Sequence, residues 1–167
     1  ENMKTVLLSF VTSLIALIFT FFIGTPTAFC IDGIKNKTLS KIMDIFVEIP
    51  IVLPPAVAGI ALLLTFGKNG MVGNFLSSHG INIIFTSTAV VIAQFFVSSA
   101  LYVRVLRDSI KAIPIELFEI SYVLGAGKIE TIIRVMLPML KKAVLSGLIL
   151  AWIRSLGEFG ATLMFAG

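Results

Sequence analysis

Four long apolar runs constrain the fold more than any other feature of this sequence; they cover residues 5–31, 45–66, 83–103 and 143–166. Each run is close to or longer than the roughly 20 residues that a helix needs to cross about 30 Å of hydrocarbon. The runs are apolar nearly all round, whereas helices of a soluble all-α protein are shorter and keep one polar face. The pattern therefore predicts an all-α protein, a polytopic transmembrane helical bundle.

The composition agrees with a membrane protein. Hydrophobic residues make up 57% of the chain and charged residues only 13%, far from the mix of a soluble domain. The first run is too long for the apolar region of a signal peptide. Because the sequence starts at Glu1 and stops at Gly167 within an apolar stretch, we expect residues 1–167 to be a single transmembrane domain from a longer protein, without its flanking helices.

Basic residues predict the orientation, because lysine and arginine near the ends of spans stay preferentially in the cytoplasm. The segment between the second and third runs contains Lys68 alone, which predicts that residues 67–82 are external. The other two connecting segments are basic and are predicted to be cytoplasmic; they contain Lys35, Lys37 and Lys41, and then Arg104, Arg107, Lys111, Lys128, Arg134, Lys141 and Lys142. Since topology explains these charges, nucleic-acid binding is not expected.

Residues 112–140 form a polar, partly amphipathic segment, called here the insert. Pro114 can open a helix that runs to about Leu124, and Gly125 and Gly127 permit a sharp turn. After the turn an apolar stripe has the spacing of an amphipathic helix: Ile129, Ile132, Ile133, Met136, Leu137 and Leu140, with Glu130, Thr131 and Arg134 on the other side. This predicts helix, glycine turn and helix at the inner membrane surface. An interfacial hairpin that merely connects two spans is the alternative.

Two further features lie inside the apolar runs. Pro50, Pro54 and Pro55 remove backbone donors, so the second span is predicted to be bent or partly unwound near its start. Such a break can serve as a gate or be a purely structural kink. Arg154 and Glu158 are spaced to share a helical face and could form a pair within the last span. They are candidates for the translocation pathway, and an anchoring or packing role for Arg154 is the alternative.

The sequence offers little for catalysis. Cys30 and His79 are each the single residue of their type, which predicts neither a disulfide nor a metal site. The stretch Gly125-Ala-Gly-Lys128 lacks the glycine spacing and the Ser or Thr of a phosphate-binding loop, so no ATP hydrolysis is expected of this chain. The spans contain no nucleophile with a nearby base. We expect no catalytic residue, no metal and no cofactor.

The insert resembles the cytoplasmic coupling motif of ABC importer permeases. That motif runs Glu-Ala-Ala, three residues, Gly, nine residues, Ile-x-Leu-Pro, and Glu119, Gly125, Leu137 and Pro138 match it. Ser121 stands at the second alanine position; Ile120 and Val135 are the other departures from the pattern. The resemblance implies a MetI-like bundle whose insert carries a coupling helix that docks in a groove of the ATP-hydrolysing subunit.

Two more stretches resemble the same family, and the likeness covers nearly the whole chain. They are Glu48-Ile-Pro-Ile-Val-Leu-Pro-Pro-Ala-Val-Ala-Gly59, followed by Gly67-Lys-Asn-Gly70, and Arg154-Ser-Leu-Gly-Glu-Phe-Gly-Ala161. Together they are similar to molybdate permeases, with tungstate and sulfate (thiosulfate) permeases next. The resemblance implies a subunit of the cytoplasmic membrane that imports an oxyanion, with ATP and Mg²⁺ used by separate ATPase subunits. It also implies an exported substrate-binding protein, periplasmic or surface-anchored, and a second copy of the permease in the lipid bilayer. A self-contained channel or secondary transporter is the alternative from another class, but the sequence shows no internal repeat.

Overall fold

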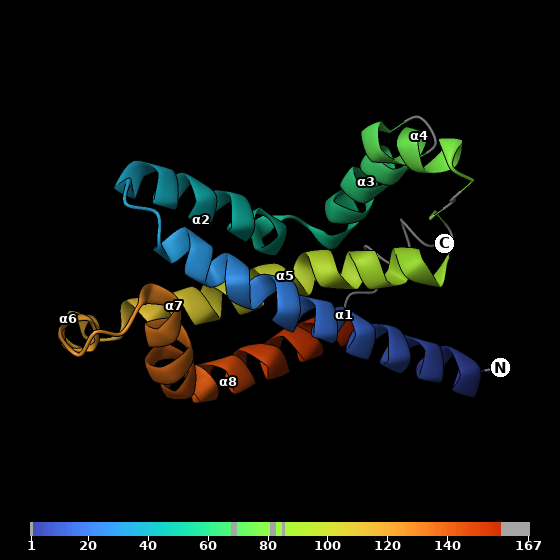
Figure 1. Cartoon of the computed structure of the whole chain (residues 1–167). Coiled ribbons are helices and arrows are strands. Elements are labelled where there is room, and N and C mark those ends of the chain that lie inside the picture. The colour runs from blue at the N-terminus through green and yellow to red at the C-terminus, as the bar shows by residue number, and fades with distance from the viewer. Residues whose placement is uncertain (1, 68–69, 81–82, 85, 158–167) are drawn as a thin grey trace.

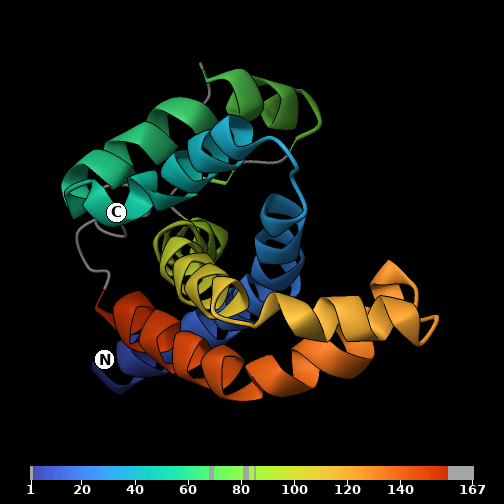
Figure 2. The same cartoon turned by 90° about the vertical axis from the view of Figure 1, so that its left-hand side faces the viewer.

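The computed structural model describes residues 2–67, 70–80, 83–84 and 86–157. Those residues form helices connected by short turns, without strands, so the predicted all-α class is confirmed. Figure 1 shows α1 (Asn2–Asp32), α5 (Ser87–Lys111) and α8 (Leu137–Leu156) running alongside one another. Viewed along the helices in Figure 2, α5 lies in the centre, with α1 and α8 on one side and α2 (Lys37–Val52) and α3 (Pro55–Phe66) on the other.

Polar contacts join the central helices within their apolar surfaces. The hydroxyl groups of Thr20 and Ser98 are 3.3 Å apart. Trp152 Nε1 of α8 donates to Ser13 Oγ of α1 at 3.1 Å. Since neither lipid nor apolar side chains can satisfy such groups, hydroxyls inside a membrane bundle pair across helices.

Tyr102 is the largest fully buried side chain of the bundle. Its hydroxyl lies 2.7 Å from Thr25 Oγ1, and two glycines border its ring. A Cβ atom at Gly24 of α1 would stand 2.7 Å from the ring, and one at Gly147 of α8 would stand 3.1 Å from it. The absence of side chains at these two positions is what allows α1 and α8 to approach α5 on both sides of the tyrosine.

The second apolar run is broken into α2 and α3, whose axes differ by 112°. The structure therefore has three helices long and apolar enough to span a membrane among the described residues, or four if this bent pair is one span. The predicted bend exists, and it falls between Val52 and Pro55, at two of the three prolines that predicted it. Pro50 lies inside α2 and does not end it.

Consecutive prolines explain the position of the break. The helical region is disfavoured for a residue that precedes proline. Leu53 precedes Pro54 and has ψ 134°, and Pro54 precedes Pro55 and has ψ 140°. Two successive extended residues end α2, and Pro55 then begins α3 at a position where its missing N–H is harmless. A single proline such as Pro50 removes one donor only, so the helix continues through it.

The two ends of the bundle carry different segments. The loop after α1 and the helices α6 (Ile115–Val123) and α7 (Lys128–Thr131) lie at one end, and α4 (Met71–Ser78) lies at the other (Figure 1). The basic segments thus share one end, as the topology prediction requires. Which end faces the cytoplasm stays a prediction.

Candidate coupling surface and broken span

The insert folds as a helical hairpin that projects beyond the ends of α1 and α5 (Figures 1 and 2). Pro114 precedes α6, which ends at Val123. The turn that follows is a Schellman motif: the N–H of Gly125 donates to the carbonyl of Tyr122, and the N–H of Ala126 donates to that of Ser121, both at 3.0 Å. The predicted order of helix, glycine turn and helix therefore describes the structure.

The two glycines of the turn differ. Gly125 has φ +83°, a left-handed conformation that only glycine adopts without cost. Gly127 has φ −71° and ψ 164°, which any residue can adopt, so its predicted role in permitting the turn is wrong. Space is not the constraint at either position, because a Cβ atom would meet nothing within 4 Å.

A π-helical turn, η1 (Ile132–Met136), joins α7 to α8. Pro138 lies just after it, and its ring and missing N–H disfavour regular bonding to the preceding turn. Leu137 N–H accordingly donates to the carbonyl of Ile132, five residues back. The leucine-proline pair of the resemblance thus coincides with a change of helical register.

The π turn changes which face of the second helix is buried. Thr131, expected on the polar side, is only 3% exposed, whereas Ile133, expected in the apolar stripe, is 60% exposed. Met136 and Leu140, two members of that stripe, are buried, whereas Ile129, a third member, is exposed. The extra residue in the turn gives a spacing of five between Thr131 and Met136, which a stripe counted at 3.6 residues per turn misses.

The residues that the resemblance implicates in coupling occupy different environments. Glu119 and Pro138 are exposed, and Leu137 is half-buried. Ser121 is 6% exposed, and its hydroxyl donates to the carbonyl of Leu117 at 2.8 Å, so it faces the protein interior. Gly125 lies between the two helices of the hairpin. These residues thus lie in α6, in the glycine turn and at the start of α8, and not all of them are surface residues.

Exposed apolar side chains surround the glycine turn. Val123 is 87% exposed and Leu124 80%, and further members of this surface are Ile115, Ile120, Ile129 and Ile133. A shallow groove beside them is lined by Gly127, Lys128, Ile129, Glu130, Ile133 and Arg134. Apolar side chains clustered with charged neighbours at the end of a bundle are typical of a surface that binds another protein. We call these residues the hairpin surface.

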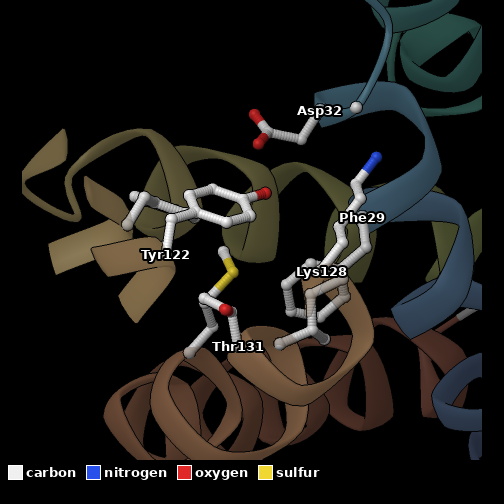
Figure 3. A pocket seen from close by; sticks show the side chains of 9 residues that line it. Phe29, Asp32, Tyr122, Lys128 and Thr131 are labelled. Carbon is white, nitrogen blue, oxygen red and sulfur yellow. The ribbon is translucent and has the colours of Figure 1, made fainter. Parts of the chain in front are cut away.

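A small cavity separates the hairpin from the end of α1. It has a volume of about 60 Å³, enough for a few water molecules. Figure 3 shows Phe29 and Asp32 of α1, Tyr122 of α6, and Lys128 and Thr131 of α7 around this space. The hydroxyl of Thr131 is buried there without a hydrogen-bond partner among the residues that the structure describes. The hairpin therefore meets α1 at a partly polar cavity, beside which Phe29 of α1 and Phe118 of α6 pack against the same apolar cluster.

A buried arginine joins three helices near the same end, and the sequence prediction used it only for topology. Arg107 of α5 is 3% exposed. Its Nε and Nη2 atoms donate to the two carboxylate oxygens of Asp44 in α2, each at 2.7 Å. Its Nη1 atom lies 3.5 Å from Asp32 Oδ1 at the end of α1. The sequence contained one signal for this ion pair. An acidic residue, Asp44, lies just before the second apolar run, and a basic residue, Arg107, lies just after the third.

The last predicted pair is only partly within the described residues. Arg154 lies in the last turn of α8 and is partly exposed. Glu158 lies outside the described residues, so the pairing of these two side chains stays a prediction. Pro54 and Pro55 lie at the break, and Pro50 is buried in α2.

Comparison with known proteins defines the family. Residues 24–167 match the model of the binding-protein-dependent transport system inner membrane component. The chain is 84% identical over 167 residues to the probable transport system permease protein NifC of Clostridium pasteurianum, covering 100% of this chain and 58% of that protein. It is 39% identical over 167 residues to the molybdenum transport system permease protein ModB of Mycobacterium tuberculosis, covering 63% of that protein.

A third relative is named for another anion. The chain is 37% identical over 153 residues to the probable sulfate transport system permease protein cysT of Helicosporidium, covering 90% of this chain and 57% of that protein. The chain thus spans less than two thirds of each of these relatives. Its apolar helices, broken span and projecting hairpin define a membrane-embedded transport component. The chain belongs to the family of binding-protein-dependent transport system inner membrane components.

Proposed function

We propose that this chain is the membrane-spanning part of an ATP-driven importer that carries an oxyanion, molybdate first, into the cytoplasm. The observation that supports it most is the 39% identity over the whole chain to a permease named for molybdenum transport. The 37% identity to a sulfate permease over 90% of the chain supports sulfate, and with it the tetrahedral oxyanions generally, as the second candidate.

The proposed partners follow from the family and from the hairpin surface. The family description names a binding protein, which we place on the external side to deliver the anion. The hairpin surface, with Gly125 at its turn, would dock on a separate ATPase subunit that uses ATP and Mg²⁺. Two copies of the chain would enclose one pathway, since such assemblies are usually symmetric. This chain would supply no ATP-hydrolysing site.

Uptake measurements on the full-length protein test the proposal. Cells with and without the intact gene are grown in low molybdenum, and intracellular molybdenum, tungsten and sulfate-derived label are measured. We expect molybdenum uptake to fall in the deletion strain and to be competed by tungstate more strongly than by sulfate. Titration of the partner binding protein with the same anions provides the independent comparison. Unchanged uptake of all the anions would contradict an oxyanion importer.

A further inference from the structure

Arg107 stands out among the basic residues that the structure describes because its guanidinium group is buried. The side chain forms a bidentate pair with Asp44, and its Nη2 atom also donates to Ser40 Oγ at 3.3 Å. Lys111 Nζ, one turn further along α5, lies 3.4 Å from the same carboxylate of Asp44. Arg107, Asp44 and Asp32 are called here the clamp. It joins α5 to α2 and to the end of α1.

The chemistry of the clamp suits a group that fixes the relative position of two helices better than one that only stabilises the fold. The Arg107 side chain is 4% exposed, whereas that of Asp44 is 23% exposed. Removing the guanidinium charge from water costs several kcal/mol, and a pair of apolar residues would often hold helices together as well. A bidentate guanidinium–carboxylate pair adds something that apolar packing lacks, because two parallel hydrogen bonds fix both distance and rotation. Arg104, one turn earlier on α5, is half-exposed and lies 3.8 Å from Glu48, so it fixes little by comparison.

The position of the clamp connects two other features. Along α5, Arg107 lies about two helical turns before Pro114, where the hairpin begins. Along α2, Asp44 lies about three turns before Pro54, where the span breaks. α2 is a continuous helix from Asp44 to Val52, and α5 is continuous from Arg107 to Lys111, three residues before Pro114. The two helices pack against each other. The hairpin also meets α1, because Phe29 of α1 and Phe118 of α6 pack against the same apolar cluster beside the small cavity that Asp32 lines.

We propose that Arg107 is a positioning residue that transmits displacement of the hairpin to α2, and thereby sets the angle at the Pro54 break. This inference rests on the proposed function, in which a partner subunit moves the hairpin. A rigid helix can carry such a displacement, but only if the two helices cannot slide or rotate past each other at the point of transfer. The bidentate pair prevents α2 and α5 from sliding or rotating past each other near the hairpin. Because the chain is broken at Pro54, a movement of α2 then changes its angle to α3.

The first test measures transport and ATP hydrolysis together. The full-length permease is reconstituted in lipid vesicles with its ATPase subunit and binding protein, as the unaltered protein and as Arg107→Gln, Arg107→Lys and Arg104→Gln. Arg107→Lys retains the charge but cannot form the bidentate pair. We expect both Arg107 variants to hydrolyse ATP, while molybdate uptake per ATP hydrolysed falls about tenfold, within the usual range of coupling between sites. The matched control Arg104→Gln should stay within about twofold of the unaltered protein.

Three results would overturn the proposal. Normal uptake per ATP in a folded Arg107 variant would show that the clamp only stabilises the fold. If both Arg107→Gln and Arg107→Lys fail to insert into the membrane, Arg107 is needed for folding and not for the transmission of displacement. An equal loss of coupling in Arg104→Gln would show that positive charge at this end of α5 matters rather than the bidentate pair of Arg107 with Asp44.

The second test separates this inference from the proposed function, because it needs neither partner nor anion. Spin labels are placed at Lys41 of α2 and Ala112 after α5, both exposed, in a protein that carries Cys30→Ser. We expect one narrow distance distribution in the inserted protein and a broader one after Arg107→Lys. An unchanged distribution would contradict the clamp. If the distribution broadens but the unaltered complex transports no oxyanion, the proposed function fails and the clamp remains.

Discussion

Replacing Gly125 by valine should impair the hairpin without disturbing the bundle. Gly125 has φ +83°, and a Cβ atom there would meet no other atom within 4 Å. The cost of a side chain is therefore purely conformational. For an L-residue the left-handed region costs about 1–2 kcal/mol, and a β-branched residue is the least suited to it. Gly127 provides a matched control, since it also has open space but a φ of −71°.

The expected loss of ATPase binding follows from the strain at residue 125. A strain of about 1–2 kcal/mol changes an equilibrium by a factor of about 5–30. Valine at 125 should thus weaken binding of the ATPase subunit about 5- to 30-fold, because the Schellman turn must form for α6 and α7 to present the hairpin surface together. Valine at 127 should weaken binding less than valine at 125, since that residue is already extended and only its place in the groove of the hairpin surface is affected. Asparagine at 125 should be intermediate, because it tolerates the left-handed region.

The assay is quantitative co-purification of the full-length permease with its ATPase subunit, followed by uptake in vesicles. Size-exclusion profiles and thermal unfolding of the permease alone should be the same for all three variants, because both glycines are exposed. The reasoning is refuted if the valine variants at 125 and 127 bind the ATPase equally well. It is also refuted if Gly125→Val transports at the normal rate.

Further predictions concern topology and packing. In intact cells with Cys30 removed, a cysteine at Asn74 should react with an impermeant thiol reagent, whereas one at Glu116 should react only after permeabilisation; the reverse pattern would invert the orientation. Tyr102→Phe should lower the free energy of unfolding in detergent by about 0.6–1.7 kcal/mol, because the contact of its hydroxyl with Thr25 is lost; an unchanged value would mean that the contact contributes nothing. Gly24→Ala should cost about 1–3 kcal/mol in the same assay, since its Cβ would overlap the ring of Tyr102. Wild-type stability of that variant would show that α1 can shift without penalty.

Several features of the fold could be predicted because they are local. The lengths of the apolar runs indicated spanning helices, and a run of prolines indicated a break in the second one. The glycine turn of the insert was also predictable, since Pro114 and Gly125 act on their own backbone and hardly depend on distant residues. Predictions of this kind succeed where the cause lies within a few positions of the effect.

Two details were not predictable in the same way, because they depend on how neighbouring prolines act together and on the register of a single turn. The burial of Thr131 and exposure of Ile133 follow from a π turn, which changes the helical period on which the apolar stripe was counted. The break falls at Leu53 and Pro54 because the two prolines there act in succession, and Pro50 alone is tolerated within α2.

The sequence by itself determined that the chain lies in a membrane, where its helices are and where the hairpin turns. Hydropathy acts through the surrounding lipid, and proline and glycine act through the local backbone. Only the tertiary structure decided which polar groups meet. Arg107 read as one more positive charge near a membrane surface, yet it is buried against Asp44, a residue 63 positions away in the chain. Such a partner is chosen by the packing of α2 against α5, and no local pattern in either helix specifies it. The same holds for Tyr102, whose place between Gly24 and Gly147 exists only because three helices converge there.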